Sequence, residues 1–491
     1  MTGDRPPVTS GSGDTHGMTP WEDEVAYLRE TFINGLVGRG FRLVHDDSEA
    51  AISNATLTGE RVTVTLGVGF PYLPPAVTTR AEVPRTWHQE SNGNLCLYTR
   101  RDRDNRPWLD PDAFLARIDL WFAKNQQGWP DDPPVLDIEA YLDMPVDARL
   151  VIYSGLDQST GQYLRLRGDD VALHILGPGK VPKNSNKGLL SGYVTSIGNL
   201  TTPPVTWNDL IGLVSDRRHV EDAIARGRIH VLLLHYQRGV QKGVLAVTLH
   251  AQKNAKPRPH KALSASADRS TMDLRAGPHS AGIADKHVYV VGAGALGSHI
   301  CDGLSRASIG KLTIRDCDIL TPSNMTRHLV ANTQRCGAPK AQAVTDELAI
   351  RPYNRTELIA DNTALVSPYE AADLFTSCDL VVDATADGAV TAMLEGAARA
   401  TRHRLLTACV QNEGRTQRVD IVPPYNDAAP LPVTTNRPPT SAEAFEAGCG
   451  EPVSATPPYA VAEAAAMVVR HIVGTLIGQP PTSAGEVRER P

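Results

Sequence analysis

The chain has 491 residues, of which 41% are hydrophobic and 21% are charged, so we expect about two to four globular domains. Its formal net charge of −6 gives no electrostatic reason to expect binding to nucleic acid or to an anionic membrane. Seven cysteines without paired spacing argue against a disulfide framework and indicate a reducing compartment.

No Cys-x-x-Cys pair occurs in the sequence, so a four-thiolate zinc site is not expected. The first residues lack the apolar core of a signal peptide, and there is no uninterrupted apolar run of about 18 residues. The most apolar late segment, 459–477, contains charged residues and predicts a packed helix. We therefore expect a cytoplasmic protein without a membrane span.

The front of the chain divides into a tail and a region of mixed elements. Residues 1–19 are rich in Gly, Pro, Ser, Thr and Asp, which predicts a disordered tail. The region 20–146 shows apolar residues first at helical spacing and then at alternating positions. We predict a helix over 21–37, strands over 51–57 and 61–68, and a second helix over 114–124.

The middle region, 147–280, is less regular. Strand-like segments occur at 151–153, 171–175, 230–235 and 244–250, and helix-like segments at 207–214 and 220–226. No glycine-rich loop follows any of these strands, so we assign the region no catalytic role. Its last part, 255–280, is rich in Lys, Pro, His, Ser and Ala and predicts a linker.

The last region, 281–491, begins with a buried strand, His287-Val-Tyr-Val-Val, and then alternates strands with helices. That alternation predicts an α/β fold with a Rossmann-like, doubly wound parallel sheet. Gly292, Gly294 and Gly297 follow the first strand and open a helix, so phosphate can approach backbone amides at a helix N-terminus. The loop pattern alone also fits dinucleotide-binding domains.

Four polar residues after the loop narrow the choice. Asp316 ends a second predicted strand about 20 residues after the glycines, where a carboxylate that binds a ribose is expected. Asn324, Arg327 and Lys340 follow. A hydride-transferring enzyme has no need for two cations here, whereas an enzyme that binds a triphosphate can use them to neutralise the leaving pyrophosphate.

Together these residues resemble the ThiF/MoeB/ubiquitin-activating superfamily over about residues 284–480. The resemblance implies binding of ATP and Mg²⁺, adenylation of the C-terminal glycine carboxylate of a ubiquitin-like protein, and a homodimer. The usual metal segment, Asp-x-Thr-Asp-Asn, is replaced here by Asp383-Ala-Thr-Ala-Asp387. Asp387 is the preferred magnesium ligand, with Asp383 as the alternative. Arg275 is a candidate for an arginine that the superfamily often supplies before the first strand.

Two cysteines are candidates for carrying a thioester. Cys449 lies between glycines in Ala-Gly-Cys-Gly-Glu-Pro, and an exposed thiol on such a segment can capture an adenylate. The superfamily resemblance places its thioester cysteine in this kind of crossover segment. The alternative for Cys449 is an incidental loop cysteine. Cys409 is interpreted as a core residue, and structural roles are also expected for Cys301, Cys317, Cys336 and Cys378.

Cys96 belongs to a second block, His88-Gln-Glu-Ser-Asn-Gly-Asn-Leu-Cys-Leu-Tyr. His88 and the Gly-x-x-Cys-Leu spacing, with the upstream strand and proline turn and Trp108 downstream, resemble an α+β ubiquitin-conjugating fold over about residues 20–140. The eukaryotic family has His-Pro-Asn where this chain has His-Gln-Glu. The asparagine that stabilises an oxyanion is therefore missing, and His88, Asn92 or Asn94 are open as substitutes. The alternative for Cys96 is a buried core cysteine.

The combined interpretation is a fused conjugating and activating enzyme, similar to those of bacterial antiphage CBASS and related ubiquitin-like operons. Cys449 would capture the modifier and Cys96 would pass it to a lysine of a target protein, with an operon-encoded nucleotide cyclase-like enzyme or peptidase as a further partner. The middle region would be a degenerate, inactive adenylation half or a spacer. The alternatives are a sulfur-carrier adenylyltransferase and a non-catalytic scaffold that binds a modifier.

Overall fold

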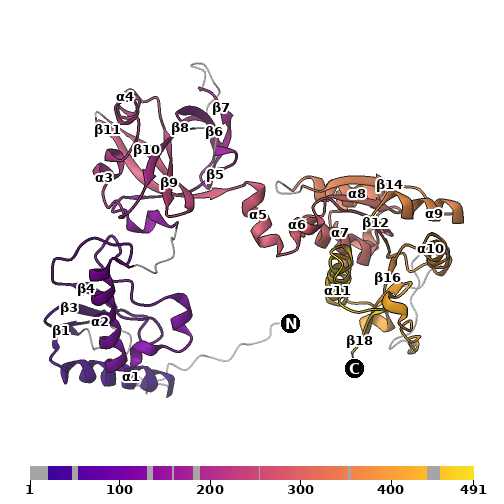
Figure 1. The fold of residues 1–491 in the computed structure, drawn as a ribbon, viewed down its shortest axis with the longest axis horizontal. Helices are drawn as coiled ribbons and strands as arrows, with labels where there is room; N and C mark the ends of the chain where they lie inside the picture. The colour runs from indigo at the N-terminus through magenta and orange to yellow at the C-terminus, as the bar shows by residue number, and fades with distance from the viewer. Residues whose placement is uncertain are drawn as a thin grey trace, which may run out of the picture. The chain divides into compact units, whose positions relative to one another are not determined.

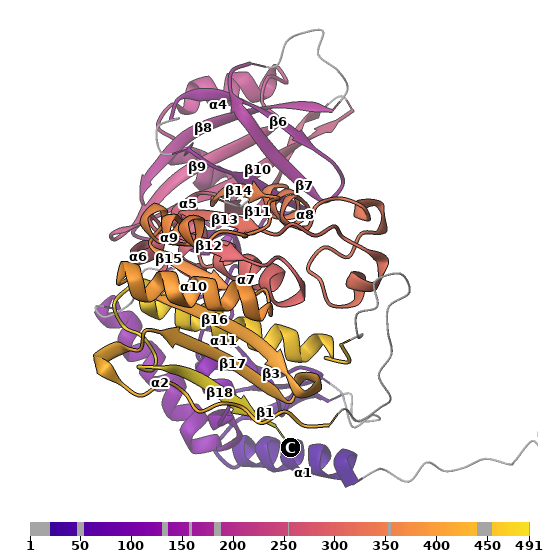
Figure 2. The same ribbon diagram turned by 90° about the vertical axis from the view of Figure 1, so that its right-hand side faces the viewer.

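The computed structural model describes residues 20–46, 54–129, 136–156, 160–180, 188–253, 255–351, 355–438 and 454–490. The chain forms two compact units, Met1–Ser266 and Ala267–Pro491 (Figures 1 and 2). The predicted tail, 1–19, lies outside the described residues. The second unit begins before the predicted boundary at residue 281.

The first unit opens with a helix and a four-stranded antiparallel sheet whose strands are adjacent in chain order. Phe32 and Leu36 of helix α1 and Val64 of the sheet share one core with Trp108 and Phe114. These elements are α1 (Pro20–Val37), β1 (Arg42–Asp46), β2 (Ala55–Thr58), β3 (Val62–Leu66), β4 (Ala76–Thr79) and α2 (Pro111–Gln127).

Local sequence explains where the second of these helices begins and ends. Asp110 caps α2 by accepting a hydrogen bond from the amide of Asp112. Gly128, at φ 75°, ends the helix in the left-handed conformation that glycine adopts without strain. Both predicted helices and the strand over 61–68 are confirmed. Strand β1 was not predicted, because nearly all its side chains are exposed and show no apolar alternation.

The rest of the first unit is a closed barrel of seven strands in the order β10-β11-β5-β7-β6-β8-β9. Leu164, Leu173 and Leu233 are among the residues of one of its buried clusters. The elements are β5 (Val146–Tyr153), β6 (Gln162–Gly168), β7 (Ala172–Pro178), β8 (Leu189–Asn199), α3 (Trp207–Gly212), α4 (Arg217–Ala225), β9 (Val231–Arg238), β10 (Gln241–Gln252) and β11 (Ala255–Ser266).

The barrel corrects two expectations for the middle region. The predicted linker over 255–280 contains β11, which pairs with β10 and with β5, and then a helix, α5 (Arg269–Ala276). A degenerate adenylation half would have a parallel sheet between helices, and the closed barrel has a different architecture.

The second unit is built on a seven-stranded sheet in the order β14-β13-β12-β15-β16-β17-β18. The first five strands in this order are parallel, and β17 and β18 are antiparallel to their neighbours. The doubly wound sheet predicted from the sequence is confirmed. Its strands are β12 (His287–Val291), β13 (Lys311–Arg315), β14 (Glu357–Asp361), β15 (Leu380–Asp383), β16 (Leu405–Gln411), β17 (Thr416–Val422) and β18 (Gly485–Glu489).

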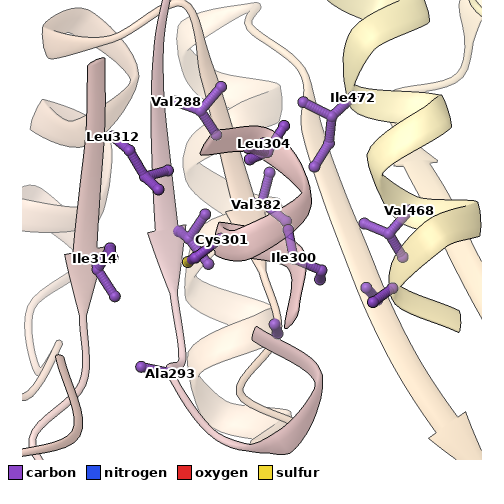
Figure 3. Close-up of a cluster of buried hydrophobic side chains, with 14 of the residues drawn as sticks. Val288, Ala293, Ile300, Cys301, Leu304, Leu312, Ile314, Val382, Val468 and Ile472 are labelled. Atoms are coloured by element: carbon purple, nitrogen blue, oxygen red, sulfur yellow. The ribbon is translucent and has the colours of Figure 1, made fainter. Parts of the chain in front are cut away.

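Helices cover both faces of this sheet and bury two separate clusters. One face packs against α6 (Ser280–Ile283), α7 (Ala295–Arg306), α8 (Lys340–Ala349) and α11 (Pro458–Leu476), and the other against α9 (Pro368–Ser377) and α10 (Gly388–Thr401). Figure 3 shows Cys301 of α7 in the first cluster, with Val288 of β12 and Ile472 of α11. By length and composition α11 would suffice to cross a membrane. Its residues Ala465, Met467, Val468 and Ile472 are buried in this core, as predicted for a packed helix.

Candidate functional site

The glycine loop lies where the chain reverses its order in the sheet. From β12 the chain builds β13 and β14 on one side, and it then continues with β15 and β16 on the other side. In such sheets the crevice at the carboxyl ends of the two central strands is the usual ligand site. The loop Gly292–Gly297 follows β12, and Asp383 ends β15, so both lie at this edge.

Close packing leaves no room for a side chain at two of the loop glycines, whereas the third glycine has an open face. A Cβ at Gly292, whose φ is 95°, would lie 2.7 Å from the carbonyl carbon of Ala384, and one at Gly297 would lie 1.9 Å from the Gly292 oxygen. Apart from the adjoining backbone, no atom of the described residues lies within 4 Å of the Cβ position at Gly294. Gly294 is the N-cap of α7 and no side chain caps that helix, so its first amides can bind an anion.

Asp316 and His328 fix the loop through Ala293. Asp316 Oδ2 accepts a hydrogen bond from the Ala293 amide at 2.7 Å, and its other oxygen accepts one from the Asp318 amide at 2.8 Å. His328 Nδ1 accepts from the Val330 amide, so the proton is on Nε2, which donates to the Ala293 carbonyl at 2.8 Å. Burial lowers the pKa of His328, which keeps this ring neutral. Sequence reasoning missed His328, because only the fold brings it to Ala293.

The two candidate cations have different partners within the chain. Lys340 begins α8, and its Nζ lies 2.9 Å from Oδ2 of the exposed Asp318. Arg327 donates from Nη1 to the Thr456 carbonyl at 3.5 Å, a distance at the limit of a hydrogen bond. Asn324 accepts two hydrogen bonds from Thr321 and thereby caps the short helix Pro322–Thr326.

The two candidate metal ligands differ in what they already bind. Asp383 is 2% exposed and accepts hydrogen bonds from the amide and hydroxyl of Thr385 and from the Thr391 hydroxyl. Asp387 is exposed, and its Oδ1 caps α10 by accepting from the Ala389 and Val390 amides. An exposed carboxylate suits Mg²⁺ better than one saturated by buried donors. The described groups therefore favour Asp387.

A pocket of about 550 Å³ adjoins this metal segment. Ala386 and Gly388 form one part of its wall, and Cys409 and Gln411 of β16 form another. Gln411 Oε1 is buried there and has no hydrogen-bond partner among the described residues. Cys409 lies on the predicted strand but is half-buried in this pocket, where burial raises the pKa of its thiol to about 11.

The remaining cysteine candidates and Arg275 do not lie together at the glycine loop in the described residues. Cys449 lies outside the described residues, which resume at Ser454. Cys301 is fully buried, as predicted, and burial raises the pKa of the Cys378 thiol to about 12. Arg275 is exposed on α5, a helix whose Asp273 accepts from the Ser308 hydroxyl, near the start of β13. Within this chain Arg275 is therefore on the amino edge of the sheet, away from the glycine loop.

In the first unit, Cys96 lies on a hairpin that begins at His88. The Cys96 amide donates to the His88 carbonyl at 2.9 Å, and Gly93, at φ 89°, makes the turn between them. Asn92 accepts from the Asn94 amide, and the Asn94 side chain donates to Glu90. These hydrogen bonds use the side-chain oxygen of Asn92 and one donor of the Asn94 amide group within the hairpin.

Cys96 and His88 line a pocket of about 250 Å³ together with Trp121, Trp129 and Lys124. The His88 ring stacks on Trp129 with ring centroids 3.5 Å apart, a contact that the sequence did not reveal. Cys96 is exposed as a residue, which disagrees with a core role. Partial burial of its thiol, with Glu90 and Asp137 nearby, raises the pKa of Cys96 to about 11.

Comparison with known proteins gives matches in the second unit. Residues 272–488 match the ThiF family. The probable adenylyltransferase/sulfurtransferase MoeZ of Mycobacterium tuberculosis is 34% identical over 112 residues, 23% of this chain and 28% of its own length. The molybdopterin-synthase adenylyltransferase of Escherichia coli is 32% identical over 132 residues, 27% of this chain and 52% of its own length. The matches thus span about half or less of these relatives.

Among solved structures, Escherichia coli tRNA N6-threonylcarbamoyladenosine dehydratase in complex with ATP is 25% identical. The match covers 31% of this chain and 63% of that one, with a TM-score of 0.27.

The family match spans the sheet from β12 to β18 and includes the glycine loop, Asp316, Arg327, Lys340 and Asp387. The second unit of this chain therefore contains a ThiF-family domain.

Proposed function

We propose that the second unit adenylates the C-terminal carboxylate of a ubiquitin-like carrier protein at the expense of ATP. The observation that carries this proposal is the fixed glycine loop at the switch point of the sheet, with Arg327 and Lys340 on segments that follow it. The matched relatives from Mycobacterium tuberculosis and Escherichia coli are both named adenylyltransferases.

The residues present suit a bound nucleotide. The open face at Gly294 and the uncapped start of α7 can bind phosphate oxygens, and Asp316 has further lone pairs for ribose hydroxyls. Asp387 would hold Mg²⁺, which supplies positive charge for the phosphates when bound. Lys340 would leave Asp318 and bind a phosphate in its place.

The adenylation step follows from these positions. A carboxylate oxygen of the carrier attacks the α-phosphorus of ATP, the bond to the β-phosphate oxygen breaks, and pyrophosphate leaves. Arg327 and Lys340 are stabilising at that moment because negative charge grows on the leaving group. The pocket lined by Ala386, Gly388 and Gln411 adjoins the metal segment, and the C-terminus of the carrier would occupy it.

We extend the proposal to transfer of the activated carrier. Cys449 would attack the acyl adenylate, releasing AMP and forming a thioester, and Cys96 would receive the acyl group by thioester exchange. Two observations support this order. The chain after Cys449 reaches the candidate nucleotide site at Thr456, which contacts Arg327. Cys96 is exposed on a hairpin after a helix and a four-stranded antiparallel sheet, an arrangement consistent with the conjugating fold that the sequence resembles. A target lysine, a homodimer and an antiphage setting stay predictions.

The names of the matched relatives favour a second candidate function, the activation of a sulfur carrier. One experiment separates the two. The full chain is incubated with ATP, Mg²⁺ and a candidate ubiquitin-like carrier, and the products are measured by non-reducing mass spectrometry. We expect pyrophosphate release and a carrier adduct that thiols remove. The incubation is repeated with sulfide as the sulfur donor. A carrier that then gains sulfur in place of a carboxylate oxygen, as AMP leaves, identifies the sulfur-carrier reaction, and the absence of pyrophosphate release contradicts both.

A further inference from the structure

Lys124 lines the pocket of Cys96, and it stands alone in its part of the sequence. It is the first lysine of the chain, and the next one is Lys180. The other long cations before Lys180 are arginines, among them Arg117, which lines the same pocket. A guanidinium stays protonated and is not an acyl acceptor, whereas the amine of a lysine can be one. Lys124 is therefore the lysine amine that this part of the chain places at the cysteine pocket.

Helix α2 presents Lys124 on the face that contacts the cysteine hairpin. Arg117, Trp121 and Lys124 are spaced four and then three residues apart, so they follow one face of the helix. Arg117 Nε donates to the Leu97 carbonyl at 2.7 Å, and Trp121 Nε1 donates to the His88 carbonyl at 3.0 Å. Lys124 is the next residue on the face that these two hydrogen bonds hold against the hairpin.

His88 connects this helix face to the cysteine. Its carbonyl also accepts from the Cys96 amide at 2.9 Å, so Cys96 and the Trp121 ring share one acceptor atom. The His88 ring stacks on Trp129 with centroids 3.5 Å apart, and Lys124 Nζ lies 5.9 Å from the centroid of the Trp129 ring. These contacts surround the pocket of about 250 Å³ that Cys96 and Lys124 both line.

The Lys124 amine can move within this pocket. Both Lys124 and Cys96 are exposed, and the contact of Lys124 with the Trp129 ring is close to the distance limit for a cation–π interaction. The amine is carried on a flexible four-carbon stem. Rotation of this side chain is therefore sufficient to bring the amine toward an acyl group on Cys96.

We propose that Lys124 is a self-modification site, which accepts the acyl group carried by Cys96 of the same chain when no target amine takes it. This inference rests on the proposed transfer role of Cys96. The neutral Lys124 nitrogen bonds to the thioester carbon, and the carbon–sulfur bond breaks. The sulfur leaves as the Cys96 thiolate, and the nitrogen loses its proton to water. The products are an amide on Lys124 and a Cys96 that can be loaded again.

A small aryl thioester tests this step without a carrier or ATP. The full chain is incubated with the thiophenyl ester of acetylglycine, whose acyl group passes to Cys96 as thiophenolate leaves. Peptide mass spectrometry then distinguishes a thioester on Cys96, which hydroxylamine removes, from an amide on Lys124, which resists hydroxylamine. We expect the amide on Lys124 in the parent. Cys96→Ala should form much less of it, because the acyl group reaches the amine through the cysteine.

Lys124→Arg keeps a cation beside Trp129 and removes the acceptor. Because a neighbouring nucleophile gains in rate from proximity, we expect the Cys96 thioester to last about tenfold longer in this variant than in the parent. The matched control is Lys180→Arg. It removes another exposed lysine that lies over an aromatic ring, 5.0 Å from the centroid of Tyr163, but that does not line the cysteine pocket. This control should leave the amide yield and the thioester lifetime unchanged.

The outcomes separate this inference from the transfer role on which it rests. A thioester that forms on Cys96 and decays equally fast in the parent and in Lys124→Arg overturns the self-modification and leaves the transfer role standing. Equal modification of Lys124 in the parent and in Cys96→Ala also overturns it, because the probe would then acylate the amine directly. A chain that forms neither the thioester nor the amide overturns both. Pyrophosphate release tests adenylation separately, since these variants lie in the first unit.

Discussion

Asp316 and His328 hold Ala293 of the glycine loop from its two backbone polar groups. The carboxylate accepts from the amide at 2.7 Å, and the imidazole donates to the carbonyl at 2.8 Å. The loop is therefore fixed by a side chain directly after β13 and by one in the segment before α8, and not only by its glycines. For the phosphate binding proposed above, such a loop would be preorganised, because its amides would not have to reorient when the anion arrives.

Lys340→Ala tests whether the cation at the start of α8 acts on the nucleotide. We expect carrier-dependent ATP–pyrophosphate exchange to fall about 30- to 1000-fold, the range for loss of one charged contact in a transition state. Lys311→Ala is the matched control, since it removes a lysine that pairs with Glu357 at the amino end of β13. Near-parental exchange in a folded Lys340→Ala protein would show that Lys340 only pairs with Asp318.

Asp387→Asn and Asp383→Asn separate a metal ligand from a structural carboxylate. Asp387→Asn should abolish Mg²⁺-dependent exchange and change the melting temperature little, because Asn can still cap α10. Asp383→Asn should destabilise the second unit by about 1–3 kcal/mol, because its amide group would face buried donors. Exchange and thermal unfolding are measured for both. Exchange that survives in Asp387→Asn but is lost in a stable Asp383→Asn protein would move the metal to Asp383.

His328 predicts a pH dependence of stability. Its pKa in the folded chain is lowered, so below the ordinary value of about 6.5 the unfolded chain takes up a proton that the native ring does not. The contribution of His328 to the free energy of unfolding is therefore fully present above about pH 6.5. It is lost as the pH falls toward the pKa of the folded chain. His328→Gln can still donate to Ala293 but does not titrate.

The measurement is urea unfolding of the parent and of His328→Gln between about pH 5 and 8. The parent should be the more stable protein at pH 8, and the difference between the two should shrink with acidification. A difference that stays constant across this range would mean that the ring binds its proton equally in both states.

The sequence predicted the second unit well because its central strands β12, β13 and β15 are buried on both faces and appear as apolar runs such as His287-Val-Tyr-Val-Val. Strand β11 did not follow from the sequence, since only Ala262 among its residues is buried and its place depends on pairing with β10 and β5. His328 could not be predicted either, because its partner, Ala293, is 35 positions away. Contacts of this kind, between residues far apart in the sequence, form only in the folded chain.

The proposed relay through two cysteines makes the sharpest prediction for the whole chain. Adenylation precedes thioester formation, so Cys449→Ala should keep pyrophosphate exchange and form no thioester on either cysteine. Cys96→Ala should still form a thioester at Cys449 but modify no target amine. The order follows from chemistry, because an acyl adenylate is more activated than a thioester and each thiol receives the acyl group in turn.

Cys378→Ala is the control for this relay, since burial already raises the pKa of that half-buried thiol to about 12. It should support exchange, both thioesters and target modification. A Cys96→Lys variant should trap the modifier as an amide that resists thiols, provided Cys449 is intact. The products are separated on non-reducing gels and identified by mass spectrometry. Normal target modification by Cys96→Ala would contradict the relay and leave the front domain a docking module, because the acyl group would then pass directly from Cys449 to the amine.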